Sequence, residues 1–378
     1  MKKFLVFTVL ASVFYLTGCY DASQVEETAY LIALGIDKNE STGFNYTFQF
    51  ASPTESKEGE EKGKSENQGV KNIVISAPDF YTAKNYITNY LSKNLNMSHM
   101  KFIVCSEEFA KNDLKKHSEL FLRERQIRPG TFMAVAQDKA EGYLKTVNPD
   151  LEGSTSKYYE LSNSQNHLNF APAVRLGDFV SRSEVLDKST VLPIAVTDKE
   201  KNAVALYGMG VFKDGQLNGK MSGEEALLFN VLSGEKKLFN FSTEDKKNKG
   251  ETLPFKCTVL KTPEFFIDET KDNIKIKTDI FIDLKFVGAE NTGGYKNKQE
   301  ILNQGEIFLK EKLTSFLYST SRVYNADILR IERFNKSRFT NINAMNKNNF
   351  KEKYKKAVFE ILIKRSNKGE NESFGGLD

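Results

Sequence analysis

The sequence predicts a multi-domain α+β protein with mixed sheets and packed helices, and three observations support this fold class. Strand and helix patterns alternate three times in the first half of the 378 residues, which favours layered α/β packing with some parallel strand pairs. Strand patterns dominate from residue 203 onward, and a long amphipathic helix pattern covers residues 298–322. We therefore expect an α/β-like N-terminal half and a C-terminal half made of a β-rich sheet with one long helix.

The chain begins with an uncharged run behind a positive head. Residues 1–3 are Met-Lys-Lys, and residues 4–18 carry no charge. Such a run is shorter than the roughly 20 residues that span a bilayer and is typical of a signal peptide. It ends on LTGC at 16–19, where a secretory signal would end on small residues alone. This ending is similar to a bacterial lipobox.

A lipobox makes Cys19 the residue that carries a membrane anchor. Its thiol would be joined to a diacylglycerol unit and the chain cleaved after Gly18, so that residues 1–18 are a lipoprotein signal peptide. Two acyl chains give stable anchoring where one gives only marginal binding. We then expect all later residues on the outer face of the cell membrane. The alternative is an N-terminal helix with a buried cysteine, which requires charge order, length and ending to coincide by chance.

A hairpin and a polar loop come next. Residues 29–36 are an apolar run that predicts a buried strand, and residues 44–50 alternate aromatic and polar side chains, which predicts a half-buried strand beside it. Residues 52–69 contain no aromatic or large aliphatic side chain. That composition predicts a disordered loop.

Three strand–helix units follow, and a further strand at 190–196 ends the N-terminal region, which we place at 19–197. The expected strands are 70–76, 101–105 and 131–137, and the expected helices are 78–95, 107–124 and 139–147. Ser76 is the expected N-cap of the first helix, with Pro78 in its first turn. Residues 155–187 predict irregular to helical structure.

The C-terminal domain is expected over 198–366. Two strands within 203–222 meet at the tight turn KDGQ, and a helix over 224–234 ends on Gly234. Residues 274–286 alternate between an apolar and a charged face, which predicts a sheet with one wet face. The amphipathic helix packs on that sheet, a last strand covers 357–365, and residues 367–378 are expected to fray.

No catalytic or nucleic-acid-binding pattern stands out. The formal charge of +4 comes from 54 basic and 50 acidic residues, a balance that gives no argument for nucleic-acid binding, which usually needs a clustered basic face. His99, His117 and His167 lack metal-site spacing, and the GMG of 208–210 lacks the rest of a dinucleotide fingerprint. No G-x-S-x-G elbow occurs either. We expect no enzyme, no cofactor and no metal.

Two further groups are candidates for chemistry or contact. If Cys19 carries the anchor, two of the three cysteines remain, and a disulfide between Cys105 and Cys257 is possible by number alone. The apolar run around Cys105 instead favours free buried thiols. The basic stretch 121–130 contains Arg123, Arg125 and Arg128, which fits either an anion or membrane-headgroup contact or a solvated helix end. With Tyr20 beside the anchor, these three arginines are the candidate interaction residues.

Several stretches combine into a family pattern. They are LTGCYD at 16–21, ALGID at 33–37, SHMKFIVC at 98–105, ALYGMGVFKDGQLNG at 205–219 and NADILRIERF at 325–334. Together they resemble the Ger(x)C family, the lipoprotein C subunit of spore nutrient-germinant receptors. Tyr20 stands where the family usually has Trp, and the Gly-rich continuation after the last stretch and a closing Trp are absent.

This resemblance implies a membrane-anchored, non-enzymatic α+β subunit. It would assemble with a multi-spanning A subunit and a transporter-like B subunit in the spore inner membrane, where the receptor senses nutrients. The main alternative is a solute-binding lipoprotein of an uptake system, which usually has two similar α/β lobes. A lipid-anchored cell-wall hydrolase would need a catalytic cluster.

Overall fold

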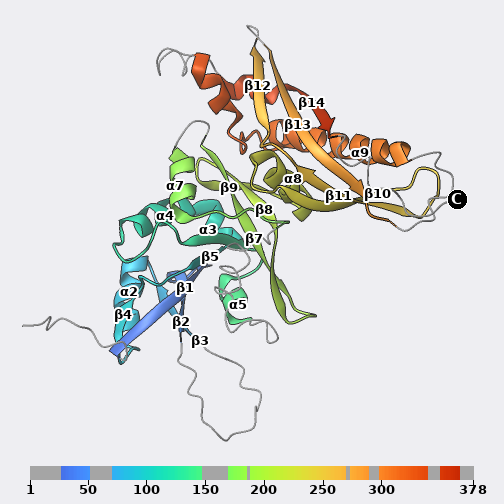
Figure 1. Ribbon diagram of the computed structural model, residues 1–378. Helices are drawn as coiled ribbons and strands as arrows, with labels where there is room; N and C mark the ends of the chain where they lie inside the picture. Colours follow the sequence, from blue (N-terminus) through green and yellow to red (C-terminus); the bar gives the residue numbers. More distant parts are fainter. Residues whose placement is uncertain are drawn as a thin grey trace, which may run out of the picture.

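The computed structural model describes residues 27–51, 70–146, 169–184, 188–269, 273–288, 298–338 and 350–366. Two sheets with packed helices organise them (Figure 1), which confirms the α+β fold class. The predicted signal peptide, Cys19, Tyr20, the loop at 52–69, His167 and the tail at 367–378 lie outside the described residues. No helix in the described ranges is long and apolar enough to cross a membrane.

The first sheet has nine strands in the order β3-β2-β1-β5-β6-β7-β8-β9, with β4 beside β1. Its strands are β1 Thr28–Asn39, β2 Gly43–Ala51, β3 Val70–Ala77, β4 Asn94–Asn96, β5 Phe102–Ser106, β6 Phe132–Ala136, β7 Ser189–Asp198, β8 Ala203–Lys213 and β9 Gln216–Met221. The predicted hairpin is β1 with β2. The predicted parallel pairing is also confirmed, because β1, β5, β6 and β7 run parallel to one another.

Helices cover both faces of the centre of this sheet. They are α2 Phe80–Thr88, α3 Glu107–Asn112, α4 Leu114–Arg123, α5 Ala140–Lys145 and α7 Leu176–Glu184. Phe102 and Val104 of β5 pack in one core with α5, whereas Ile103 of the same strand packs in the core with α2, α3 and α4. Burial on both faces explains why the central strands are continuous apolar runs.

The expected start and end of the first helix are wrong. Its N-cap is Asp79, whose carboxylate accepts a hydrogen bond from the Thr82 N–H at 2.9 Å. Ser76 is still in β3, where its hydroxyl donates to Asn45 Oδ1 at 2.7 Å, and Pro78 therefore precedes the helix. The helix ends at Thr88, because 94–96 form β4 against β1. The second expected helix is divided at Asp113 into α3 and α4.

The second sheet has five strands. They are β10 Leu238–Glu244, β11 Thr252–Val259, β12 Glu264–Glu269, β13 Ile274–Phe286 and β14 Val358–Arg365. The predicted alternation in β13 is confirmed, since Ile276 and Ile280 are buried while Lys277 between them is exposed. The long helix α9, Lys298–Tyr318, packs on the buried face, and its Gly305 lets it approach the Phe255 ring closely.

Four further elements complete the described fold, and Figure 1 shows one of them, α8, between β9 of the first sheet and β11 of the second. They are α8 Gly223–Ser233, the π-helix η2 Ser319–Val323, the 3-10 helix η3 Ile331–Arg338 and α11 Phe350–Lys355. The proposed domain boundary at 197/198 falls inside β7, just before its last residue, Asp198, and the sheet that contains β7 continues to Met221. The division of the chain at that position stays a prediction.

Candidate functional site

The predicted arginines lie on one exposed segment. Arg123 ends α4, and Arg125 and Arg128 lie in the loop that leads into β6; all three side chains are exposed. Between them, Gln126 Oε1 accepts a hydrogen bond from the Met97 N–H at 3.0 Å. The structure thus brings the basic segment beside the loop before β5. Cys19 and Tyr20, the other predicted site residues, are outside the described residues.

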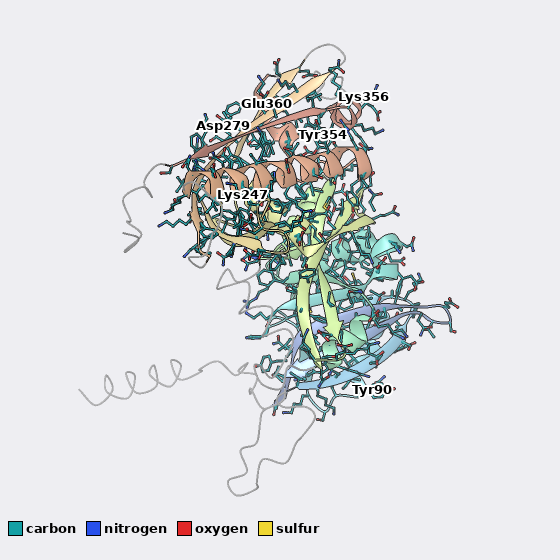
Figure 2. All side chains as sticks on the ribbon, turned by 90° about the vertical axis from the view of Figure 1, so that its right-hand side faces the viewer. Tyr90, Lys247, Asp279, Tyr354, Lys356 and Glu360 are labelled. Carbon is teal, nitrogen blue, oxygen red and sulfur yellow. The ribbon has the colours of Figure 1, made fainter. Side chains whose placement is uncertain are left out.

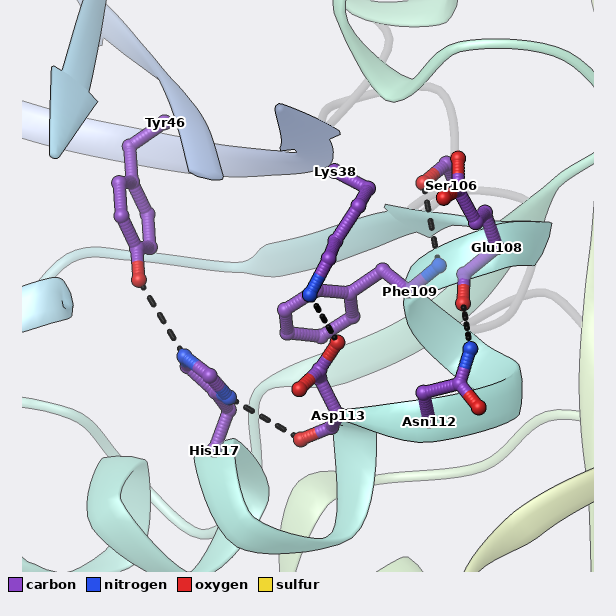
Figure 3. A network of polar contacts seen from close by, with 8 residues as sticks. All are labelled: Lys38, Tyr46, Ser106, Glu108, Phe109, Asn112, Asp113 and His117. Carbon is purple, nitrogen blue, oxygen red and sulfur yellow. Dashed lines mark hydrogen bonds and ion pairs between the residues drawn. The ribbon is translucent and has the colours of Figure 1, made fainter. Parts of the chain in front are cut away.

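A buried polar network joins β2 to α4 (Figure 3). Tyr46 OH lies 3.2 Å from His117 Nε2, and His117 Nδ1 lies 3.0 Å from the Asp113 carbonyl oxygen. Since a carbonyl only accepts, Nδ1 carries the proton and Nε2 accepts from the tyrosine hydroxyl. On the nearby surface Lys38 Nζ forms a 3.0 Å ion pair with the Asp113 carboxylate.

The surroundings of His117 keep it neutral. Burial lowers the pKa of the imidazole and raises the pKa of the Tyr46 hydroxyl. The ring packs edge-on against Phe44 and Phe109 at centroid distances of 4.8 Å. A neutral, enclosed His that has a partner on each nitrogen has no group left to act on a substrate. The network therefore holds the helix against the sheet.

The two described cysteines are also unsuited to chemistry. Cys105 and Cys257 are free and buried, and they lie in different sheets, so the disulfide that their number allowed is not formed. Burial raises the pKa of both thiols, that of Cys257 to about 12. Since the thiolate is the nucleophile and the metal ligand, these thiols are inert. In the ranges that the structure describes, no cluster of His, Cys, Asp and Glu could hold a metal ion.

The stretches that carry the family resemblance have structural roles in the fold. Asp37 of ALGID accepts hydrogen bonds from the Ala140 and Glu141 N–H groups at 2.8 and 3.0 Å, and so caps α5. Burial raises the pKa of this carboxyl against the lowering effect of those two bonds. Asp327 of the last stretch accepts from the Ile331 and Glu332 N–H groups at the start of η3, both at 2.8 Å.

The glycine-rich stretch lies where two backbones meet. Gly208 has a φ of +94°, and a Cβ there would lie 2.7 Å from the Met221 carbonyl oxygen. Gly219 faces the ring of Tyr324, whose hydroxyl donates to the Lys220 carbonyl at 2.5 Å. A side chain at Gly219 would collide with that ring. This stretch thus joins the first sheet to the segment that follows α9.

Comparison with known families finds matches along most of the chain. The family described as "Spore germination protein N-terminal domain" matches residues 21–197. The family described as "Spore germination B3/ GerAC like, C-terminal" matches residues 207–365.

Individual relatives agree with these matches. The chain is 21% identical to spore germination protein B3 of Bacillus subtilis (strain 168) over 344 residues, which covers 84% of this chain and 86% of the relative. It is 25% identical to spore germination protein KC of the same organism over 151 residues, 39% of this chain and 37% of the relative. The crystal structure of the GerBC protein shares the fold, with a TM-score of 0.55 at 17% identity over 88% of this chain and 97% of that one.

Proposed function

Since this chain belongs to the Ger(x)C family of spore germination proteins, we propose that it is a lipid-anchored subunit of a germinant receptor. A role in spore germination is common to its relatives. The proposal adds an anchor at Cys19 and assembly with membrane-spanning A and B subunits. The folded part would act on the outer face of the spore inner membrane, and the subunit would work by docking without catalysing a reaction.

The observation that carries the proposal is the LTGC sequence at 16–19, and the first family match begins two residues after Cys19, at residue 21. The nine residue steps from Cys19 to Thr28, where β1 begins, extend to at most about 32 Å. An acylated Cys19 would therefore hold the first sheet close to the membrane surface.

The docking role is supported by what the described polar groups do. His117, Asp37 and Asp327 are engaged in holding helices, and both described thiols are buried. Docking uses surface instead, where aromatic and Arg side chains usually contribute most of the binding energy. Tyr20, Arg123, Arg125 and Arg128 are our candidate contact residues, toward a partner subunit or toward the membrane headgroups that surround it.

The alternative, a solute-binding lipoprotein, fits the architecture less well. Such proteins have two similar α/β lobes joined by hinge strands. Here one sheet is mixed and has nine strands, and the other has five strands with one long helix on its face. This difference between the sheets favours the receptor subunit.

Germination of spores that lack the chain tests the proposal. These spores should fail to respond to a nutrient sensed through the same receptor, and should still germinate with a receptor-independent trigger. Spores with Cys19→Ala should share the defect, while spores with Thr17→Ser, which keeps a small residue before the cleavage site, should respond normally. A normal nutrient response without the chain would contradict the proposal.

Calorimetric titration separates docking from nutrient binding. The full chain in detergent, titrated with single amino acids, should show no saturable heat. Tight binding of an amino acid by the isolated subunit would overturn the docking role and favour the solute-binding alternative.

A further inference from the structure

One edge of the first sheet gathers the starts of its parallel strands. Thr28 of β1 pairs with Asn94 of β4, and Phe102 at the start of β5 pairs with Phe132 at the start of β6. The helices α2 and α4 return to this edge, because each follows the far end of a strand that runs parallel to β1. We call the residues 28–30, 88–101 and 123–131 the amino edge.

Hydrogen bonds hold the segments of the amino edge together. Besides the bond from Met97 to Gln126, the Thr131 hydroxyl donates to the Met100 carbonyl at 3.3 Å, and the Phe132 N–H donates to the Lys101 carbonyl at 2.9 Å. Lys84 of α2 forms an ion pair of 2.8 Å with Glu124. The amino edge is therefore one ordered surface.

Of two exposed tyrosines, Tyr90 belongs to the amino edge and Tyr86 lies next to it in α2. Tyr86 is 49% exposed near the end of α2, and Tyr90, just past the helix, is 67% exposed. A large aromatic side chain with so much exposed area has an apolar body that a partner can cover and a hydroxyl that can stay in water.

The charge of the amino edge is positive. Six side chains of the amino edge are basic and exposed: Lys93, His99, Lys101, Arg123, Arg125 and Arg128. Glu124 is the one acid in these segments, and Lys84 pairs with it; Glu27 lies just before β1.

We propose that the amino edge is a lipid-binding surface that lies against anionic membrane headgroups. Tyrosine is enriched at membrane interfaces because its ring sits at the headgroup level, and basic side chains near an anionic leaflet are attracted to it. The inference rests on the proposed anchor, because the tether from Cys19 reaches at most about 32 Å and enters the fold at Thr28, next to β4. Of the surfaces of the first sheet, the amino edge is the one beside this entry point.

The rest of the molecule fits this orientation. Figure 2 shows Tyr90 at the end of the molecule remote from Asp279 and Glu360 of the second sheet. With the amino edge on the membrane, the second sheet points away from the lipid and stays available to protein partners.

The experiment uses the full acylated chain in vesicles that contain phosphatidylglycerol and lipids with a nitroxide quencher near the headgroup. A fluorophore is attached to Tyr90→Cys; the native Cys105 and Cys257 are buried and react slowly. The matched control is Tyr81→Cys, 43% exposed at the other end of α2. We expect strong quenching at position 90 and little at position 81.

Charge removal then tests the headgroup contact. Arg125→Ser with Arg128→Ser should weaken the membrane-facing orientation, by roughly fivefold for each charge lost, and lower the quenching at position 90. Lys116→Ser with Lys199→Ser removes two exposed charges from the first turn of α4 and from the β7–β8 turn, and should leave the quenching unchanged.

The outcomes separate the two proposals. Chains that float with the vesicles but show equal quenching at positions 81 and 90, or none at position 90, would overturn the lipid-binding edge and leave the anchor intact. Chains that do not float would overturn the anchor and the edge with it. Equal effects of the two double substitutions would also contradict the headgroup contact.

Discussion

The two sheets differ in how many of their faces are buried. In the centre of the first sheet, adjacent residues of β5 lie in separate cores, with Phe102 toward α5 and Ile103 toward α2, α3 and α4. In the second sheet, β13 buries one face beneath α9, while its other face carries ion pairs such as Lys364 with Asp279 at 2.6 Å. The strand β5 is therefore apolar along its length, whereas β13 alternates between apolar and charged side chains.

This difference determines which surfaces each region can offer to a partner. Where helices cover both faces of a sheet, interactions are left to its edges and loops, and the amino edge is such a surface. Where one face is wet, the face itself is available, although in the second sheet paired charges occupy much of it.

The largest expected effects contrast neighbouring positions in the two sheets. Phe102→Ala should lower the free energy of unfolding by about 3–5 kcal/mol and Ile103→Ala by about 2–5 kcal/mol, because both leave cavities. In β13, Ile276→Ala should cost about 2–5 kcal/mol, whereas Lys277→Ala should stay within about 0.5 kcal/mol. Denaturant unfolding followed by circular dichroism measures all four. If Phe102→Ala or Ile103→Ala left the free energy of unfolding unchanged, β5 would not be buried on both faces, and the two sheets would not differ in this way.

The junction between the regions should give the next largest effect. Gly219→Ala places a methyl group 2.4 Å from the Tyr324 ring and should lower the free energy of unfolding by about 1–3 kcal/mol. In a Tyr324→Ala background the same change should cost much less, because the colliding ring is gone. A double-mutant cycle measures this coupling, and strictly additive effects would show that the two residues are not in contact.

The change of stability with pH should be smaller than the effects of these substitutions. We expect it to come from His117, in α4 on the first sheet. Burial lowers the pKa of His117 in the folded state, so between that pKa and the unfolded value of about 6.5 the unfolded chain binds more protons. Stability is therefore lost as the pH falls below about 6.5, by at most about 1.4 kcal/mol per pH unit.

Replacement of His117 tests its share of this dependence. The slope of unfolding free energy against pH should be flatter in His117→Gln than in the wild type, while His99→Gln, which changes an exposed ring, should keep the wild-type slope. An unchanged slope in His117→Gln would show that another group titrates.

The smallest effect is expected on the wet face of the second sheet. Lys364→Ala removes an ion pair whose side chains are 43% and 36% exposed, and should change the free energy of unfolding by less than about 1 kcal/mol. The same denaturant measurement applies. If Lys364→Ala lowered the free energy of unfolding by several kcal/mol, this face of the second sheet would not be exposed to solvent.

Most strands can be predicted from the sequence because the burial of a strand determines the local pattern of its apolar residues. Continuous apolar runs marked β1 and β5, and alternation marked β2 and β13. β10 was missed, because its exposed positions include Leu238 and its pattern is weaker. The residue type of Ser76 favours a helix cap, but the pairing of β3 with β2 keeps this residue in the strand. A local sequence pattern contains no information on that pairing.

Contacts between segments that are distant in the sequence could not be predicted from local sequence patterns. Asp37 lies 103 positions before Ala140, at the start of the helix that it caps, so the sequence around Asp37 does not reveal this capping role. The basic character of the segment with the three arginines is visible in the sequence, and the structure adds that they are exposed. Their proximity to the loop before β5 depends on the parallel register of β5 and β6, and this register becomes visible only in the fold.

The central claim, that Cys19 anchors the chain, is tested most directly by the mass of its N-terminal peptide. Lys38 is the first basic residue after Cys19, so tryptic digestion of the membrane-extracted protein should release residues 19–38 as one peptide. We predict that this peptide begins at Cys19 and carries a diacylglyceryl group on the thiol. A mature chain that begins elsewhere, or an unmodified thiol at Cys19, would contradict the account.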